Sequence, residues 1–499
     1  MAVATRNMPG ARFLTRARPM LAGLAAGVLV ALGAPVASQA QGPVSVADLA
    51  EGLADAVVNI STSQTVQGER TVPLPQVPDG SPFQEFFEEF FNQQNREDDR
   101  PRRVQSLGSG FVIDGTAGII ITNNHVIEGA DEIVANFNDG TKLKAELIGT
   151  DEKTDIAVLK VTPEKPLVDV SFGDSDKIRV GDWVMAIGNP FGLGGTVTVG
   201  IVSARNRDIN SGPYDNFIQT DASINRGNSG GPLFDMDGRV IGINTAIISP
   251  SGGSIGIGFA IPANTATRII AQLREFGETR RGWLGVRIQE VTEEIAESLD
   301  RGTDTSGALV AGLNEGGPAE AAGIQPGDII LEFAGKKVAT MRELPRMVAE
   351  SSIGDAVDVK LWRKGEEVTL KVELGRLEEA AEAAESDKSG TDTPEPAVTD
   401  EEVLGMVLSE LDDEARAKFG ISEEVTGVLV SEVAAGSPAE EKRIEAGDVI
   451  KEVAQEPVAT AQEVIDAVAA LKAEGRRLAL LLLANPDGVL RYVPVRIED

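Results

Sequence analysis

The sequence predicts a mainly β protein, in which two small barrels are followed by two copies of a smaller module. Residues 44–277 hold short apolar runs separated by Gly, Asn and Asp, which is typical of antiparallel barrels rather than alternating strand–helix units. After residue 280 one pattern recurs at a fixed shift along the chain. The length of 499 residues is enough for about three domains of ~150 residues each.

Composition excludes several classes of function. The chain has 46 basic and 78 acidic residues and a net charge of −32, which argues against nucleic acid or anionic lipid surfaces as partners. It has no cysteine and one histidine, so disulfides and thiolate chemistry are excluded and a transition-metal cluster is not expected. No Walker-type loop is present. We therefore expect no cofactor and no metal.

The N-terminus has the pattern of a secretory signal peptide over residues 1–40. An apolar run from Met20 to Leu32 precedes the small-residue site Ser38-Gln39-Ala40. A membrane anchor is the alternative, but the run is short for a span of ~20 residues. We expect export to a bacterial envelope without stable membrane insertion. Four arginines and no acid lie in the first residues: Arg6, Arg12, Arg16 and Arg18.

The heptapeptide GNSGGPL, residues 227–233, predicts a nucleophile. Glycines on both sides allow Ser229 to lie on a tight turn with its hydroxyl exposed. The backbone amides along Gly227, Asn228 and Ser229 can then point at one spot and form an oxyanion hole. Taken alone, such a cluster also fits an ordinary hairpin turn.

A serine needs a base, and His125 is the only histidine in the chain. It follows the apolar run GIIIT, which predicts a strand that passes into a turn. Asp155 opens the alternating strand TDIAVLK and can orient the imidazole. Each residue alone fits a structural role, the histidine in a core and the aspartate as a strand cap. Together, the order His, Asp, Ser is that of the chymotrypsin-like double β-barrel.

Several long stretches resemble one family. GSGFVI, ITNNHVI, TDIAVLK, GDWVMAIGNPFGLGGTVTVGIVSA, FIQTDASINRGNSGGPL and GIGFAIP are similar to the HtrA family of Do-like (DegP/DegQ type) periplasmic serine endoproteases. The resemblance implies a trypsin-like serine protease domain over residues 44–277, with His125 as general base, Asp155 as its orienter and Ser229 as nucleophile. It implies a location in the periplasm of a Gram-negative-type bacterium. It also implies stress-related quality control, in which unfolded or damaged envelope proteins are degraded. A chaperone or peptide-binding scaffold is the rival function, and the triad leaves a dual role open.

A polar insertion at about residues 62–104 interrupts the first barrel. Its segment SPFQEFFEEFF places phenylalanines at helical spacing between Phe83 and Phe91. Such a stripe is either core or an exposed contact surface. It resembles the family's loop that reaches into a neighbouring protomer, although Glu88 and Glu89 replace the family's usual basic residues.

The repeat has a shift of 120 residues. We call residues 281–376 the first module and residues 401–499 the second module; both resemble PDZ domains of the HtrA kind, small β-sandwiches or barrels with helices. In the first, the loop Leu284, Gly285, Val286 would offer amides to a peptide carboxylate, beside an edge strand that pairs with the peptide. The alternative is an ordinary turn. Leu284-Gly285, Gly307, Pro318, Gly327-Asp328 and Leu344 recur as Leu404-Gly405, Gly427, Pro438, Gly447-Asp448 and Val464.

The second module departs from the first at Lys442-Arg443, which replaces Ala322-Gly323 and removes a glycine turn. Between the modules, residues 377–400 are acidic and poor in apolar side chains, which predicts a flexible linker.

The resemblance also implies partners and control. The partners are unfolded or misfolded envelope proteins and peptide C-termini, and the assembly is a homotrimer able to build larger oligomers. Arg207, in the loop RNRDINSGPYD, matches a residue that in the family helps to switch the oxyanion loop when the first module senses a peptide. The alternative for Arg207 is a surface charge on a solvated hairpin.

Overall fold

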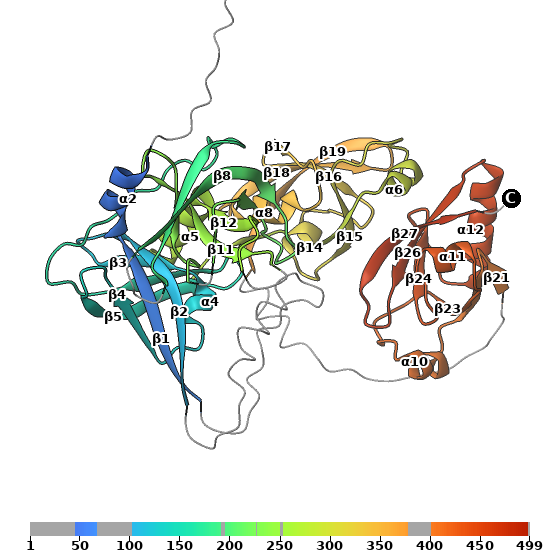
Figure 1. The fold of residues 1–499 in the computed structure, drawn as a ribbon. Coiled ribbons are helices and arrows are strands. Elements are labelled where there is room, and N and C mark those ends of the chain that lie inside the picture. The colour runs from blue at the N-terminus through green and yellow to red at the C-terminus, as the bar shows by residue number, and fades with distance from the viewer. Residues whose placement is uncertain are drawn as a thin grey trace, which may run out of the picture. The chain divides into compact units, whose positions relative to one another are not determined.

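The computed structural model describes residues 45–66, 102–190, 195–225, 227–249, 253–377 and 401–497. Three predicted features lie outside these ranges: the signal peptide at 1–40, the phenylalanine stripe and nearly all of the linker at 377–400. The described chain is mainly β, as predicted, with two closed barrels followed by two sheet-based modules (Figure 1).

The first barrel closes in the order β1-β2-β3-β6-β5-β4. Its core is built by β-branched runs, which favour strands because they pack well on a pleated surface; all four residues of β3 are buried. Helix α2 (Ala47–Ala54) precedes the barrel, and the short helix α4 (Asn124–Ile127) follows β3. The strands are β1 (Val57–Val66), β2 (Arg102–Asp114), β3 (Ile119–Thr122), β4 (Glu132–Asn136), β5 (Lys142–Asp151) and β6 (Ile156–Lys160).

Strands β1 and β2 are longer than the sequence suggests. They pair antiparallel from Val57↔Phe111 to Val66↔Arg102. Both ends of the range predicted as insertion, 62–104, are therefore paired strand, because a backbone ladder can continue through polar residues once its register is fixed.

The second barrel closes in the order β10-β11-β12-β9-β8-β7. Together, the two closed barrels confirm the predicted double barrel. Helix α5 (Ala263–Phe276) follows and packs on β5, β6, β11 and β12. It ends at Gly277, whose left-handed backbone (φ 77°) lets its N–H donate to the Leu273 carbonyl. The strands are β7 (Trp183–Gly188), β8 (Thr196–Arg207), β9 (Phe217–Thr220), β10 (Pro232–Phe234), β11 (Val240–Ile247) and β12 (Gly258–Pro262).

The first module has a sheet in the order β14-β15-β16-β18-β19, with β17 beside β16 and a separate pair of β13 with β20. Its core lies between the sheet and helix α8 and includes Leu284, Phe333 and Leu344. The elements are β13 (Gly282–Trp283), β14 (Val286–Glu290), α6 (Glu293–Ser298), β15 (Ala308–Leu313), α7 (Pro318–Ala321), β16 (Ile329–Phe333), β17 (Lys336–Lys337), α8 (Glu343–Ala349), β18 (Ala356–Arg363), β19 (Glu366–Glu373) and β20 (Gly375–Arg376).

The second module repeats this plan with one strand added at the edge, in the order β21-β22-β23-β24-β26-β27, with β25 beside β24. Helix α12 begins at a capping box formed by Thr460 and Glu463. The elements are β21 (Glu401–Val403), β22 (Met406–Glu410), α10 (Asp413–Phe419), β23 (Val428–Val433), α11 (Pro438–Glu441), β24 (Val449–Val453), β25 (Glu456–Pro457), α12 (Ala461–Ala473), β26 (Leu478–Ala484) and β27 (Leu490–Arg496).

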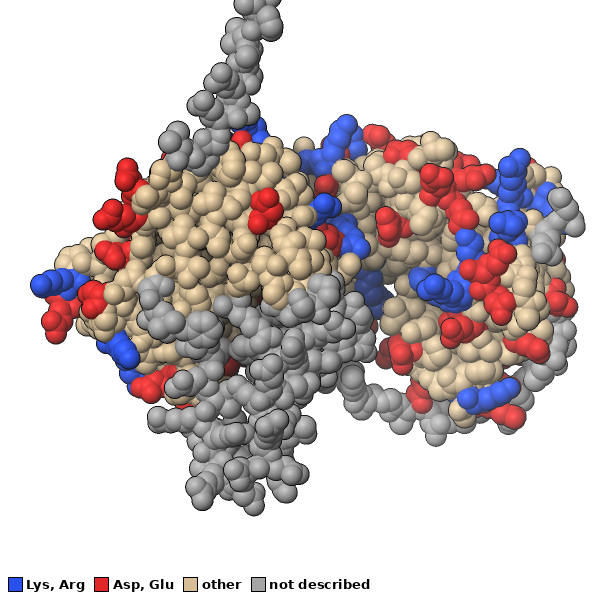
Figure 2. Space-filling model, viewed as in Figure 1, with Lys and Arg blue, Asp and Glu red and all other residues tan. Residues whose placement is uncertain are grey.

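Charge is mixed on the surface. On the face drawn in Figure 2, acidic and basic side chains are interspersed, so the net negative charge does not form one continuous field there. No helix within the described ranges has the length and apolar content that a bilayer crossing needs.

Candidate active site

His125 and Asp155 meet at one end of the first barrel. His125 lies on α4, just after the buried strand β3, and Asp155 lies in the turn between β5 and β6. His125 Nδ1 is 2.7 Å from Asp155 Oδ2, and the backbone N–H of His125 donates to Asp155 Oδ1 at 3.0 Å. An ionised carboxylate only accepts, so Nδ1 carries the proton and Nε2 is the basic nitrogen.

Asp155 is fixed by its backbone as well. It has a left-handed conformation (φ 57°), which Asp tolerates better than most residues. Its carbonyl accepts a hydrogen bond from Asn123 Nδ2 at 2.7 Å. The turn before β6 is therefore tied to the turn after β3, which presents both carboxylate oxygens to the histidine.

Thr245 of β11 completes the site, and sequence reasoning missed its role. Its Oγ1 donates to Asp155 Oδ2 at 2.5 Å. Its backbone carbonyl accepts a hydrogen bond from Ser229 Oγ at 3.4 Å. Thr245 thus touches both Asp155 and Ser229, and the three predicted residues lie in one site. Contacts that span 90 positions in the chain leave no local sequence signal.

The surroundings raise the pKa of His125 above its ordinary value. Burial of the ring lowers the pKa, but the charge of Asp155, its hydrogen bond and the charge of Glu128 together raise it by more. The carboxylate thereby favours the imidazolium that forms when His125 accepts a proton.

The loop that carries Ser229 depends on two glycines. Gly227 and Gly230 have φ of 101° and 82°. A Cβ at Gly230 would lie 2.3 Å from the Ser109 carbonyl oxygen, and one at Gly227 would lie 2.6 Å from Pro190 Cβ. These close contacts and positive φ values explain why glycines flank the serine.

Ser109 of β2 joins this loop to the first barrel. Its backbone N–H donates to the Ser229 carbonyl at 2.8 Å. Its hydroxyl donates to the Gly227 carbonyl at 2.5 Å and accepts from the Asn189 N–H at 2.8 Å. Ser109 belongs to the family motif GSGFVI, from which sequence reasoning assigned it no role.

The structure differs from the sequence prediction at one position of the oxyanion hole. The Asn228 N–H donates to the Asn225 carbonyl at 3.0 Å, so it is already used within the loop. The Asn228 N–H points away from the predicted oxyanion hole because successive amides in a tight turn face different sides. Gly227 and Ser229 remain the candidate donors.

Family models match the chain where the fold has its domains. A trypsin-like peptidase domain matches residues 108–243, and PDZ domains match residues 282–374 and 397–483. The DegP-like periplasmic serine endoprotease of Brucella suis biovar 1 (strain 1330) is 43% identical over 475 residues, covering 91% of this chain and 90% of that protein. The chain belongs to the HtrA family of DegP-like periplasmic serine endoproteases.

Further relatives agree with this HtrA membership. A protein of the same description from Hahella chejuensis (strain KCTC 2396) is 40% identical over 464 residues, with 92% of this chain and 96% of that protein covered. The solved HtrA-type protease AlgW with decapeptide is 40% identical, covers 67% of this chain and 99% of its own, and has a TM-score of 0.55. The predicted family, serine endopeptidase class and periplasmic localisation are confirmed. Within the described residues, no group of His, Cys, Asp and Glu could hold a metal.

Arg207 is the last residue of β8. Its Nε donates to Gln219 Oε1 at 2.9 Å. The first module contacts the loop that follows β8 through another residue. Arg342 forms an ion pair with Asp208 and donates to Asn210 Oδ1 at 3.1 Å. Sequence reasoning missed Arg342, which is distant in the chain and belongs to no motif.

The predicted peptide loop of the first module leads into β14, at the edge of the sheet. Leu284 is buried, and its carbonyl accepts from the Ala319 N–H at 2.9 Å. Gly285 has a φ of 77°, and Val286 starts β14, which is the edge strand of the sheet.

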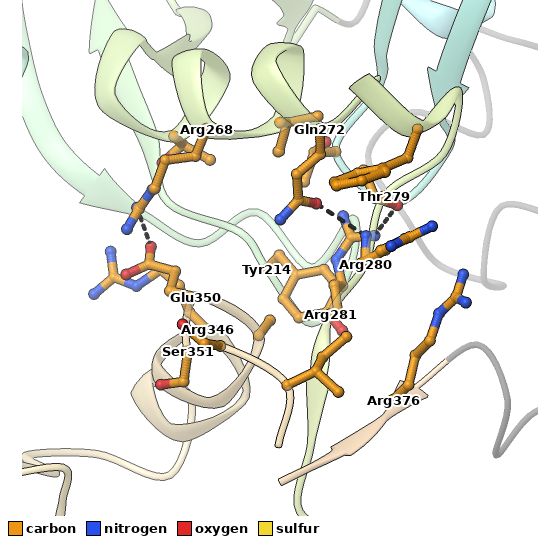
Figure 3. A pocket seen from close by; sticks show the side chains of 17 residues that line it. Tyr214, Arg268, Gln272, Thr279, Arg280, Arg281, Arg346, Glu350, Ser351 and Arg376 are labelled. Carbon is orange, nitrogen blue, oxygen red and sulfur yellow. Dashed lines mark hydrogen bonds and ion pairs between the residues drawn. The ribbon is translucent and has the colours of Figure 1, made fainter. Parts of the chain in front are cut away.

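A cavity of about 640 Å³ lies where α5 and the segment after it face the first module. Figure 3 shows the arginines that line it, and Arg268 forms an ion pair with Glu350 at 2.5 Å. Arg281 is buried and forms an ion pair with Asp151. Five arginines line this cavity: Arg268, Arg280, Arg281, Arg346 and Arg376.

Proposed function

We propose that this endoprotease cuts its substrates through Ser229, His125 and Asp155. The observation that carries the proposal is the chain of hydrogen bonds from His125 through Asp155 to Thr245, whose carbonyl accepts from the Ser229 hydroxyl. This chain links residues from both barrels in one site. It supports the roles that the HtrA resemblance implies.

The geometry suggests the usual two-step course. Ser229 Oγ attacks the scissile carbonyl while His125 Nε2 takes the hydroxyl proton. The oxyanion is met by the amides of Gly227 and Ser229, and His125 then protonates the leaving amine. Water, activated by the same nitrogen, hydrolyses the acyl-enzyme. Asp155 keeps the tautomer and stabilises the imidazolium throughout.

We infer that the substrates are unfolded or misfolded envelope proteins, which expose the extended segments that a protease cleft needs. The first module would capture peptide segments and C-termini by strand addition to β14. By family resemblance, the assembly is a homotrimer able to form larger oligomers, which light scattering at defined protein concentrations tests.

The test is labelling with a serine-directed fluorophosphonate, with and without an unfolded substrate such as casein. We expect one label per active chain on Ser229 and stronger labelling with substrate. Ser229→Ala should lose label and cleavage while its circular dichroism stays unchanged, because the oxyanion hole alone leaves only about 10³-fold catalysis over water. Ser171→Ala, an exposed serine, is the matched control. Normal cleavage by Ser229→Ala would exclude the assignment.

The rival chaperone function can be read from the same variant. If Ser229→Ala binds an unfolded protein and suppresses its aggregation, the chain has a holding activity beside proteolysis. If Ser229→Ala binds no unfolded protein, the capture of substrate depends on a catalytically active site.

A further inference from the structure

The two modules have the same plan up to the edge where a PDZ domain receives its peptide. In the first, β14 follows Leu284-Gly285 and faces no further strand in the described sheet. The short segment before the loop, β13, leaves this edge and pairs with β20. In the second module, the segment before Leu404-Gly405 stays at this edge of the sheet. It turns back as β21 and pairs with β22.

The backbone of the loop explains this difference. In the second module both turn residues have positive φ, 56° at Leu404 and 80° at Gly405. Two central residues with positive φ make the two-residue turn that joins antiparallel strands of a hairpin. In the first module only Gly285 of the pair has a positive φ, so the chain passes the loop without folding back.

Strand β21 lies where an added peptide strand would lie. It runs antiparallel to β22, with Val403 opposite Met406 and Glu402 opposite Val407. It contacts helix α12, which corresponds to α8 beside the open edge of the first module. Val403 packs against the module core that contains Val464 and Val468 of α12. Val403 therefore fills the position of an apolar end residue, next to the loop that would hold a carboxylate.

We propose that the second module has a peptide-binding groove that its own strand β21 fills, so that a foreign peptide binds only when β21 is displaced. The groove suits an extended peptide with an apolar end residue, since Val403 occupies it. A covalently attached strand acts at a high effective concentration, in the millimolar range for short connections, so a free peptide competes poorly. The proposal builds on the proposed peptide capture by the first module but uses its own readout.

The first experiment counts peptide sites on the full-length chain with Ser229→Ala, which prevents cleavage. The probe is a fluorescent peptide ending in valine with a free carboxylate, titrated by anisotropy. We expect one site per chain. Val403→Asp places a charge against the apolar groove and should release β21, so that a second site appears with affinity at least about 10-fold above any second-site binding of the parent. Val403→Ile keeps the contact and should leave one site.

The absence of cysteine gives an independent test. Glu402→Cys and Val407→Cys introduce a pair at directly opposed positions, where Cα atoms lie about 4.5–5.5 Å apart, a separation that a disulfide can span. We expect rapid cross-linking on oxidation. In the triple variant with Val403→Asp, oxidation should remove the second site and reduction should restore it.

The outcomes separate the two proposals. No cross-link, or two sites in the parent chain, would overturn the filled groove. A folded Val403→Asp chain with no second site would overturn it too. A parent chain that binds no peptide contradicts capture by the first module, while a site gained in Val403→Asp would still support the filled groove.

Discussion

The two barrels contribute to one site by different means. The first barrel supplies a histidine and an aspartate held by side-chain hydrogen bonds, with Asp155 accepting from His125 and from Thr245. The second supplies a serine whose loop is held by backbone conformation, with positive φ at Gly227 and Gly230. Each barrel also steadies the other's half, because Thr245 lies in the second and Ser109 in the first. The site therefore exists only when the barrels are packed together.

The largest effect should come from the charged half of the site. Asp155→Asn keeps the shape but can donate to His125 Nδ1, which favours the wrong tautomer. We expect kcat to fall by about 10⁴-fold with stability nearly unchanged, measured with a short fluorogenic peptide. Asp169→Asn changes an acid that binds Gly115 in the same barrel and should cleave normally. Normal turnover by Asp155→Asn would show that the aspartate only supports the turn.

The links between the barrels come next. Ser109→Ala leaves the Gly227 carbonyl and the Asn189 amide without their partner, at about 1–3 kcal/mol for each buried group. We expect kcat/KM to fall by about 10- to 100-fold. Thr245→Val removes one donor to Asp155 and should lower it by about 10-fold.

Fluorophosphonate labelling rates distinguish these two variants. Ser109→Ala should slow labelling because the nucleophile loop shifts, and its pH profile should stay in place. Thr245→Val should move the pH profile of His125 as well. Equal behaviour of the two variants would contradict the division of labour between the barrels.

The pH dependence follows from the raised pKa of His125. Only neutral imidazole accepts the serine proton, so kcat/KM should rise with pH through a midpoint above the ordinary value of about 6.5. The contribution of His125 to the free energy of unfolding changes with pH in the opposite direction. It is fully present below about pH 6.5 and is lost as pH rises through the raised pKa. A rate profile flat into acid, with the fold intact, would point to another base.

The smallest effect should come from Arg207, whose Nε donates to Gln219 Oε1. Arg207→Ala should lower peptide-stimulated cleavage by about fivefold, the lower end of typical coupling between sites, while the peptide affinity of the isolated first module stays unchanged. Arg205→Ala, which changes a neighbour bound to the Ser175 carbonyl, is the matched control. If the stimulation curves of Arg207→Ala and the parent chain coincide, Arg207 is only a surface charge.

Local patterns in the sequence were enough to predict the double barrel and the duplicated module, and they singled out His125, Asp155 and Ser229 as candidates for one site. The order of these three residues along the chain and the repeat of the modules can be recognised without knowing any distance within the fold. Ser109 and Thr245 escaped because their contacts join residues 118 and 90 positions apart. The filled edge of the second module escaped for another reason. Both modules carry Leu-Gly, but the leucine has a positive φ at Leu404 and not at Leu284.

The arginine-lined cavity has a consequence for how firmly the first module is attached. One contact there is shielded from solvent: the side chains of Arg281 and Asp151 are 7% and 4% exposed. The pair of Arg268 with Glu350 is open, with the arginine 52% exposed. Dissolved salt screens open charges over about 8 Å at physiological ionic strength and leaves shielded pairs largely untouched. A rise in ionic strength should therefore weaken the pair of Arg268 with Glu350 and leave the pair of Arg281 with Asp151 in place.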